Sequence, residues 1–147
     1  MTSRLRPWQG LPRLWARVMA REGQTMIGQG MQLNEVTFSE ARPVDGYGPG
    51  FFRVGGVLHN GALLVTATRL SSWGGYEDSA SLIALVGTVD VVFIGTGSEI
   101  AHIPTALRQK LEEAGLGVEV MNSPAACRTY NVLLSEGRRI ALAVLPV

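Results

Sequence analysis

The chain has 147 residues, of which 46% are apolar and 17% are charged, and its 13 basic and 12 acidic residues leave a net charge of +1. This composition excludes a disordered or collagen-like chain, and the near-neutral charge gives no indication of a nucleic-acid partner. No apolar run reaches the roughly 20 residues of a membrane span, so we expect a soluble protein. The single cysteine, Cys127, excludes an internal disulfide, and with two histidines it forms no metal-binding pattern. We therefore predict no metal and no cofactor.

The charge is distributed unevenly along the chain. Residues 1–25 carry five arginines and one acid, a net charge of +4, whereas the rest of the chain carries 8 bases and 11 acids, a net charge of −3. Prolines and glycines interrupt a helix in the first segment. We expect 1–25 to be a basic, disordered leader and 26–147 to be one domain. A mitochondrial transit peptide, a membrane-surface anchor or a translation start at Met26 or Met31 are alternative interpretations.

Antiparallel strands are predicted for the first half of the domain. Residues 32–38 alternate polar and apolar side chains, which is typical of a half-buried strand. Residues 41–50 are rich in glycine and proline and predict a loop. Asn60 and Gly61 lie between two apolar runs, and this pair favours a type I′ hairpin turn because both central residues adopt positive φ. We therefore expect an N-terminal antiparallel hairpin around them.

Helices and strands alternate in the second half. Apolar runs predict strands, and helical spacing bounded by serine, proline or glycine predicts helices. The predicted elements are a helix at 79–86 with Ser79 as a candidate cap, a strand at 89–94, a helix at 104–114, a strand at 118–121, a helix at 124–136 and a strand at 140–145. This order predicts an α/β fold of three layers, with a central mixed, mostly parallel sheet and helices packed on it.

The Gly95-Thr96-Gly97 turn follows a predicted buried strand, which is where open α/β sheets bind ligands. The dinucleotide fingerprint needs a third glycine where Ile100 stands, and the next helix begins only at Pro104. A P-loop is excluded because no Gly-Lys-Ser/Thr follows. The turn therefore predicts a close backbone approach more than a phosphate site.

A second group of candidates lies on the helix that begins at Pro124. Cys127 is about one turn into this helix, where the helix dipole lowers a thiol pKa, and it is a candidate nucleophile or a small buried apolar side chain. Arg128, Tyr130 and Asn131 offer donors to an anion or to a partner's carboxylates, or they pack and tie loops. No third residue that would orient a His102–Cys127 pair is identifiable.

Four motifs together carry a family resemblance: FIGTG at 93–97, GVEV at 117–120, SPAACRTYN at 123–131 and EGRR at 136–139. On these motifs the chain is similar, over about residues 31–146, to a family of small uncharacterised α/β proteins. This MTH938-like family includes assembly factor 3 of mitochondrial respiratory complex I. The resemblance implies a three-layer fold, no established enzymatic activity and no agreed ligand.

The resemblance also implies a scaffold or chaperone role during complex I assembly for the mitochondrial member. We therefore predict a non-enzymatic binding or scaffold protein with respiratory complex subunits as partners. The candidate surface comprises Gly95, Thr96, Gly97, Cys127, Arg128, Tyr130 and Asn131. The alternative is a small-molecule-binding protein or enzyme with a pocket beside the 95–97 turn. A cytoplasmic location is predicted for a bacterial chain, and the mitochondrial matrix for a eukaryotic one.

Overall fold

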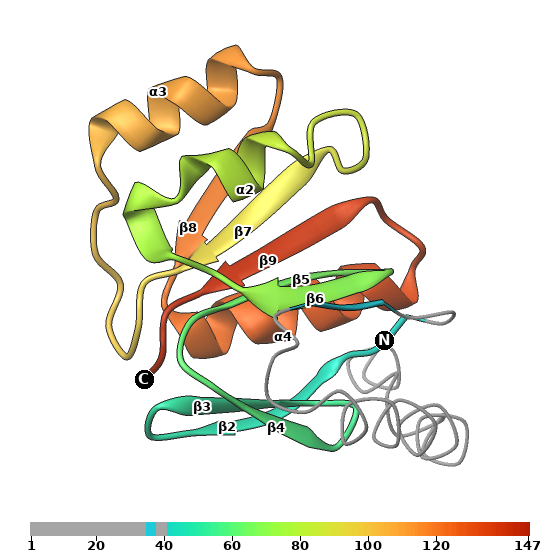
Figure 1. Cartoon of the computed structure of the whole chain (residues 1–147). Coiled ribbons are helices and arrows are strands. Elements are labelled where there is room, and N and C mark those ends of the chain that lie inside the picture. Colours follow the sequence, from blue (N-terminus) through green and yellow to red (C-terminus); the bar gives the residue numbers. More distant parts are fainter. Residues whose placement is uncertain (1–34, 38–40) are drawn as a thin grey trace.

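The computed structural model describes residues 35–37 and 41–147. The predicted leader at 1–25 lies outside the described residues, as do parts of the strand predicted at 32–38. In this part of the chain, two sheets and three α-helices form the fold (Figure 1). The helices are α2 (Ser79–Ile83), α3 (Thr105–Glu113) and α4 (Ser123–Ser135), with a 3-10 turn, η4 (Gly75–Glu77), before α2.

A six-stranded sheet forms the centre of the molecule. Its strands are β1 (Glu35–Thr37), β5 (Leu63–Thr66), β6 (Arg69–Ser72), β7 (Val91–Gly95), β8 (Gly117–Met121) and β9 (Ile140–Val144). Their order in space is β1-β6-β5-β9-β7-β8, and only the β9–β7 and β7–β8 pairs are parallel. The expectation of a mostly parallel sheet is therefore wrong, and the sheet is mixed. The physical reason is that β5 and β6 form a hairpin that pairs antiparallel with β9.

A second, three-stranded antiparallel sheet contains β2 (Val44–Gly48), β3 (Phe51–Val54) and β4 (Val57–Asn60). The loop predicted at 41–50 is therefore wrong in part, because an edge strand with a bulge tolerates the glycines of β2. An antiparallel hairpin is present in the first half, but its turn differs from the prediction. Gly55 and Gly56, with φ of 58° and 84°, connect β3 to β4.

The Asn60-Gly61 pair instead connects the two sheets, since β4 and β5 belong to different ones. Gly61 has a φ of 84°, but no residue other than glycine has positive φ among the described residues, so Asn60 does not form the type I′ turn. The short helix α2 ends at Ile83, earlier than predicted, and its cap is Asp78 and not Ser79. The Asp78 carboxylate accepts a hydrogen bond from the Ser81 backbone N–H.

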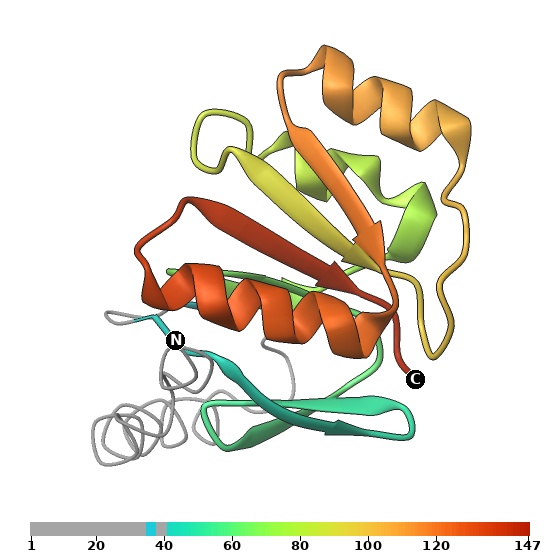
Figure 2. The same ribbon diagram turned by 180° about the vertical axis from the view of Figure 1, so that it is seen from behind.

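Two apolar cores cover the two faces of the six-stranded sheet. Along β7, Phe93 packs with α4 and the small sheet, whereas Val92 and Ile94 pack with α2 and α3. This alternation follows from the two-residue period of a strand. Figures 1 and 2 show α2 and α3 on one side of the sheet and α4 on the other. None of the helices in the described ranges is long and apolar enough to cross a membrane.

Candidate functional site

The Gly95-Thr96-Gly97 turn ends β7 against the first residues of α4. A Cβ atom at Gly95 would lie 2.7 Å from the Ser123 Oγ, 2.7 Å from the Val144 Cγ1 and 2.8 Å from the Ser123 Cα. Because one of these contacts is with backbone, no side-chain rotation relieves it. Glycine is therefore required for α4 to approach the end of the sheet this closely.

Ser123 joins the turn, α4 and the end of β9. Its Oγ accepts a hydrogen bond from the Gly97 N–H at 2.9 Å and donates one to the Leu145 carbonyl at 2.6 Å. Its own N–H donates to the Gly97 carbonyl at 2.8 Å, and the Leu145 N–H donates to the Gly95 carbonyl at 3.0 Å. The protein itself occupies these polar groups, so the turn acts as a structural junction. The sequence feature that could have identified Ser123 is its position directly before Pro124, which begins the predicted helix.

Thr96 orders the loop that leaves the turn. Its hydroxyl donates to the Glu99 carbonyl at 2.6 Å and accepts from the Ala101 N–H at 3.2 Å. Its N–H donates to the Met121 carbonyl at 3.0 Å, which ties the turn to the end of β8. The loop 98–104 is thus held by the residue that precedes it in the turn.

Cys127 lies in the core between α4 and the sheet. It is 4% exposed, and burial raises the pKa of its thiol from 9.0 to about 12, with Arg128 opposing this shift. A thiol with this pKa is almost entirely protonated near neutral pH and is a weak nucleophile. Arg128, the next residue, is exposed at the surface of the helix.

Asn131 connects α4 to the small sheet. Its side-chain oxygen accepts a hydrogen bond from the Val44 N–H at 2.9 Å, and its side-chain nitrogen donates one to the Val44 carbonyl at 2.8 Å. The amide therefore pairs with β2 as a neighbouring strand would. Tyr130 is fully buried beside it, and burial raises the pKa of its hydroxyl, which has no hydrogen-bond partner among the described residues.

The predicted site residues therefore lie in different parts of the fold. Gly95, Thr96 and Gly97 lie at the end of β7, whereas Tyr130 and Asn131 are buried near the small sheet. Cys127 is buried between α4 and the sheet, and Arg128 is at the surface. None of them lines either of the two cavities described next.

A cavity of about 450 Å³ lies beside the loop that follows the turn. It is lined by Ile100, Ala101, His102, Ile103, Thr105, Arg108 and Val120. Its volume falls in the range of roughly 300–1,000 Å³ that is usual for ligand pockets. The prediction of a pocket beside the turn named none of these lining residues, because nothing local in the sequence places Arg108 of α3 near Val120 of β8.

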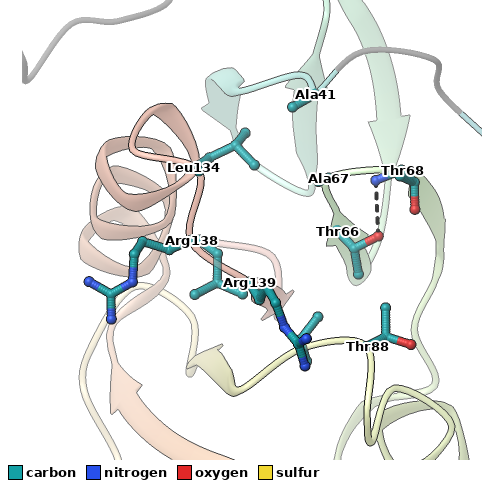
Figure 3. Close-up of a pocket in the computed structure, with 11 residues that line it drawn as sticks. Ala41, Thr66, Ala67, Thr68, Thr88, Leu134, Arg138 and Arg139 are labelled. Carbon is teal, nitrogen blue, oxygen red and sulfur yellow. Dashed lines mark hydrogen bonds between the residues drawn. The ribbon is translucent and has the colours of Figure 1, made fainter.

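A second cavity, of about 300 Å³, lies at the opposite end of the sheet (Figure 3). It is lined by Ala41, Thr66, Ala67, Thr68, Thr88, Val89, Leu134, Gly137, Arg138, Arg139 and Ile140. In Figure 3 the Arg138 side chain points away from Thr66 and Thr68. Arg139 donates to the Gly87 carbonyl at 3.0 Å and forms an ion pair with Asp90 at 3.3 Å. The lining thus offers mainly apolar surface, with one arginine already paired.

Arg42 is the buried charged residue that the sequence did not single out. It is 2% exposed, and a Cβ at Gly55 would lie 2.8 Å from its Cδ. Burial, and to a lesser extent the charge of Arg42, lowers the pKa of His59 below its usual value. Arg42 thus lies against the β3–β4 turn at Gly55.

Comparisons with known proteins give the chain's relatives. A family model described as a protein of unknown function, DUF498/DUF598, matches residues 44–145. The chain is 49% identical over 117 residues to an uncharacterised protein of Rhodobacter capsulatus, covering 80% of this chain and 94% of that protein. It is 29% identical over 147 residues to human NADH dehydrogenase (ubiquinone) 1 alpha subcomplex assembly factor 3, covering 95% of this chain and 79% of that protein.

Among solved structures, the chain resembles one from Bordetella pertussis that is described as a Mth938-like domain. The TM-score is 0.61 at 26% sequence identity, and the match covers 79% of this chain and 92% of that one.

Proposed function

This chain belongs to the DUF498/DUF598 family of proteins of unknown function, and from that premise we propose that it is a non-enzymatic protein-binding module that assists the assembly of a respiratory membrane complex. The observation that carries the proposal is the similarity to human assembly factor 3, because the alignment covers 95% of this chain. The proposed partners are subunits of that complex. The proposed location is the cytoplasm of a bacterium or the mitochondrial matrix of a eukaryote.

The chemistry of the described residues supports binding over catalysis. The Cys127 thiol is buried and has a pKa of about 12, which removes the strongest candidate nucleophile. Within the described ranges, no hydrogen bond orients the His102 ring, and no group of three His, Cys, Asp or Glu residues could hold a metal ion. Covalent catalysis needs a side-chain nucleophile that a base or a lowered pKa activates.

The candidate residues have different parts in this proposal. Gly95, Gly97 and Asn131 would hold α4 and the small sheet in place through the contacts described above. Arg128 would present a positive charge to a partner from the exposed side of α4. Substitution of the first three should act through stability, whereas Arg128→Ala should weaken partner binding and leave the fold intact.

Affinity capture from membranes of the native organism tests the proposal. We expect the wild-type chain to recover respiratory subunits or membrane-insertion factors, and deletion of its gene to lower the amount of assembled NADH dehydrogenase complex. Arg128→Ala is the matched surface variant, with Arg138→Ala as its control. Normal complex levels in the deletion strain, with no respiratory subunit captured, would overturn the proposal.

A small-molecule binding role is the second candidate, favoured by the cavity of about 450 Å³ beside the turn. A thermal-shift screen of nucleotides and small anions distinguishes it. A ligand at 100 times its Kd stabilises the folded protein by about 2.7 kcal/mol. Stabilisation that Arg108→Gln removes would support this role, and no stabilisation across the screen would exclude it.

A further inference from the structure

Among the strands of the described residues, β8 forms one edge of the six-stranded sheet and pairs only with β7. The Gly117 N–H donates to the Asp90 carbonyl at 2.9 Å, and the Met121 carbonyl accepts from the Thr96 N–H at 3.0 Å. Backbone groups of alternate residues in a strand point to opposite sides. The N–H and C=O groups of Val118 and Val120 therefore point away from β7, and in the described ranges no backbone hydrogen bond reaches them.

The cavity of about 450 Å³ borders this free edge at Val120. In Figure 2 the segment between β7 and α3 runs along the outer side of β8. The Thr96 hydroxyl holds this segment on itself through Glu99 and Ala101, and Thr96 contacts β8 at its last residue, Met121, beyond Val118 and Val120. Ile100 of the segment is 67% exposed and offers an apolar contact to an arriving chain. The edge is thus bordered by a space and not paired with its own loop.

Among the described residues, the ionisable side chains that line the cavity include no acid. Arg108 and His102 contribute to the lining, and no acidic residue is among the described lining residues. The Arg108 guanidinium pairs with Glu112 of its own helix at 3.3 Å, with side-chain exposures of 41% and 50%. Exposed pairs of this i,i+4 kind contribute only about 0.3–0.5 kcal/mol. A carboxylate entering the cavity can therefore replace Glu112 at little cost.

We propose that the β8 edge and this cavity bind an extended segment of a partner protein, which pairs with Val118 and Val120 as an added strand and directs an acidic side chain toward Arg108. This inference rests on the proposed function and adds to Arg128 of α4 a second surface that performs it. Strand addition obtains affinity from main-chain hydrogen bonds and specificity from pockets for alternate side chains. Val120 shares its face of the sheet with Ile94, so a partner residue opposite Val120 enters the α3 side, where the cavity lies.

A second copy of the chain fits this edge less well. Two-fold antiparallel pairing centred on β8 would place Glu119 opposite the same residue of the other copy. Like charges directly opposite each other destabilise a strand pair. Such a pair would also bring no carboxylate to Arg108.

Two synthetic peptides of alternating valine and threonine, one with a central glutamate and one with a central lysine, test the inference on the full chain. Amide hydrogen exchange, measured by NMR, shows directly whether the outward N–H groups of β8 become hydrogen-bonded. We expect the glutamate peptide to slow exchange at Val118 and Val120, while Glu119, whose backbone N–H faces β7, remains unchanged. Equal binding of both peptides, or no slowing at these two amides, would overturn the inference. The same slowing on raising protein concentration without peptide would assign the edge to a second copy.

Substitutions test whether the peptide binds at this cavity. Arg108→Glu should weaken binding of the glutamate peptide roughly tenfold or more, since a hydrogen bond to a charged group is lost and repulsion is added. Arg138→Glu makes the same charge change at an exposed position outside this cavity and should leave binding unchanged. Val120→Pro removes one outward N–H group and should also weaken binding. Edge strands tolerate a proline whose missing N–H would face outward. Equal affinity in wild type and Arg108→Glu would contradict the inference.

Capture from native membranes separates this inference from the proposed function. If Arg108→Glu and Val120→Pro recover respiratory subunits as the wild type does, the β8 edge is not the interface, although the proposed function stands. If the wild type recovers none, the proposed function itself fails. If both variants lose subunits that Arg138→Glu retains, both proposals are supported.

Discussion

The two sides of β8 differ in how completely the protein satisfies its own polar groups. On the inner side, the turn at the end of β7 is closed by Ser123, whose hydroxyl and N–H make three hydrogen bonds to Gly97 and Leu145. On the outer side, Val118 and Val120 present backbone groups along an edge that borders a cavity. The motif residues Gly97 and Ser123 thus maintain the junction, whereas the free side combines the edge of the GVEV motif with cavity residues such as Arg108 that no motif includes.

The largest expected effect concerns the reactivity of Cys127, which is buried between α4 and the sheet. A pKa of about 12 in place of 9.0 lowers the thiolate fraction near neutral pH roughly a thousandfold. We expect alkylation of native Cys127 to be slower by at least this factor than in a Cys127→Ala, Leu58→Cys variant, because Leu58 is 45% exposed. Mass spectrometry over time measures both rates. Similar rates would show that the α4 core opens readily.

Asn131→Ala should lower the free energy of unfolding by about 3 kcal/mol. The change leaves the Val44 N–H and C=O buried without partners, and each such group costs roughly 1–3 kcal/mol. Denaturant unfolding measures the loss. Ser135→Ala, at an exposed position on the same helix, is the control and should change stability by less than about 0.5 kcal/mol. Equal effects would mean that the amide does not connect α4 to the small sheet.

Gly95→Ala should destabilise the protein by about 2 kcal/mol, since overpacking typically costs roughly 1–3 kcal/mol and the new methyl group meets backbone. Gly46→Ala is a matched strand glycine where a Cβ would have no atom within 4 Å, and it should leave stability unchanged or slightly higher. Thermal or denaturant unfolding of both variants compares the closed junction with an open strand. A tolerated Gly95→Ala would contradict the close approach of α4.

Tyr130→Phe should change stability by no more than about 1 kcal/mol, and toward higher stability. The hydroxyl is buried without a hydrogen-bond partner among the described residues, so its removal relieves a desolvation cost. A loss well above 1 kcal/mol in denaturant unfolding would indicate that the hydroxyl has a partner in solution.

The pH dependence of stability should carry a small contribution from His59. Burial, and then the charge of Arg42, lowers its folded-state pKa below 6.5. As pH falls below the unfolded value, the unfolded chain takes up a proton that the folded protein resists, so stability decreases. His59→Gln should flatten this decrease in denaturant unfolding at pH values below about 6.5, the ordinary pKa of histidine. An unchanged slope would show that another group titrates.

Local patterns in the second half of the chain predicted its elements well. The strand at 89–94 and the helix at 104–114 correspond to β7 and α3 within two residues at each end, because apolar period, proline starts and glycine stops act over a few residues. The family predicted from the motifs is confirmed. The hairpin predicted at Asn60-Gly61 was wrong because a turn signal does not specify which sheet each flanking strand joins.

The sequence by itself determined the alternation of helices and strands, the glycine turn after β7 and the family. Only the tertiary structure decided that the β5–β6 hairpin pairs antiparallel with β9, that Asn131 binds Val44 and that Arg108 lines the same cavity as Val120. The physical reason is the distance along the sequence between the residues in contact. Elements form from neighbours in the chain, whereas these contacts join residues far apart in sequence, 87 positions in the case of Asn131 and Val44.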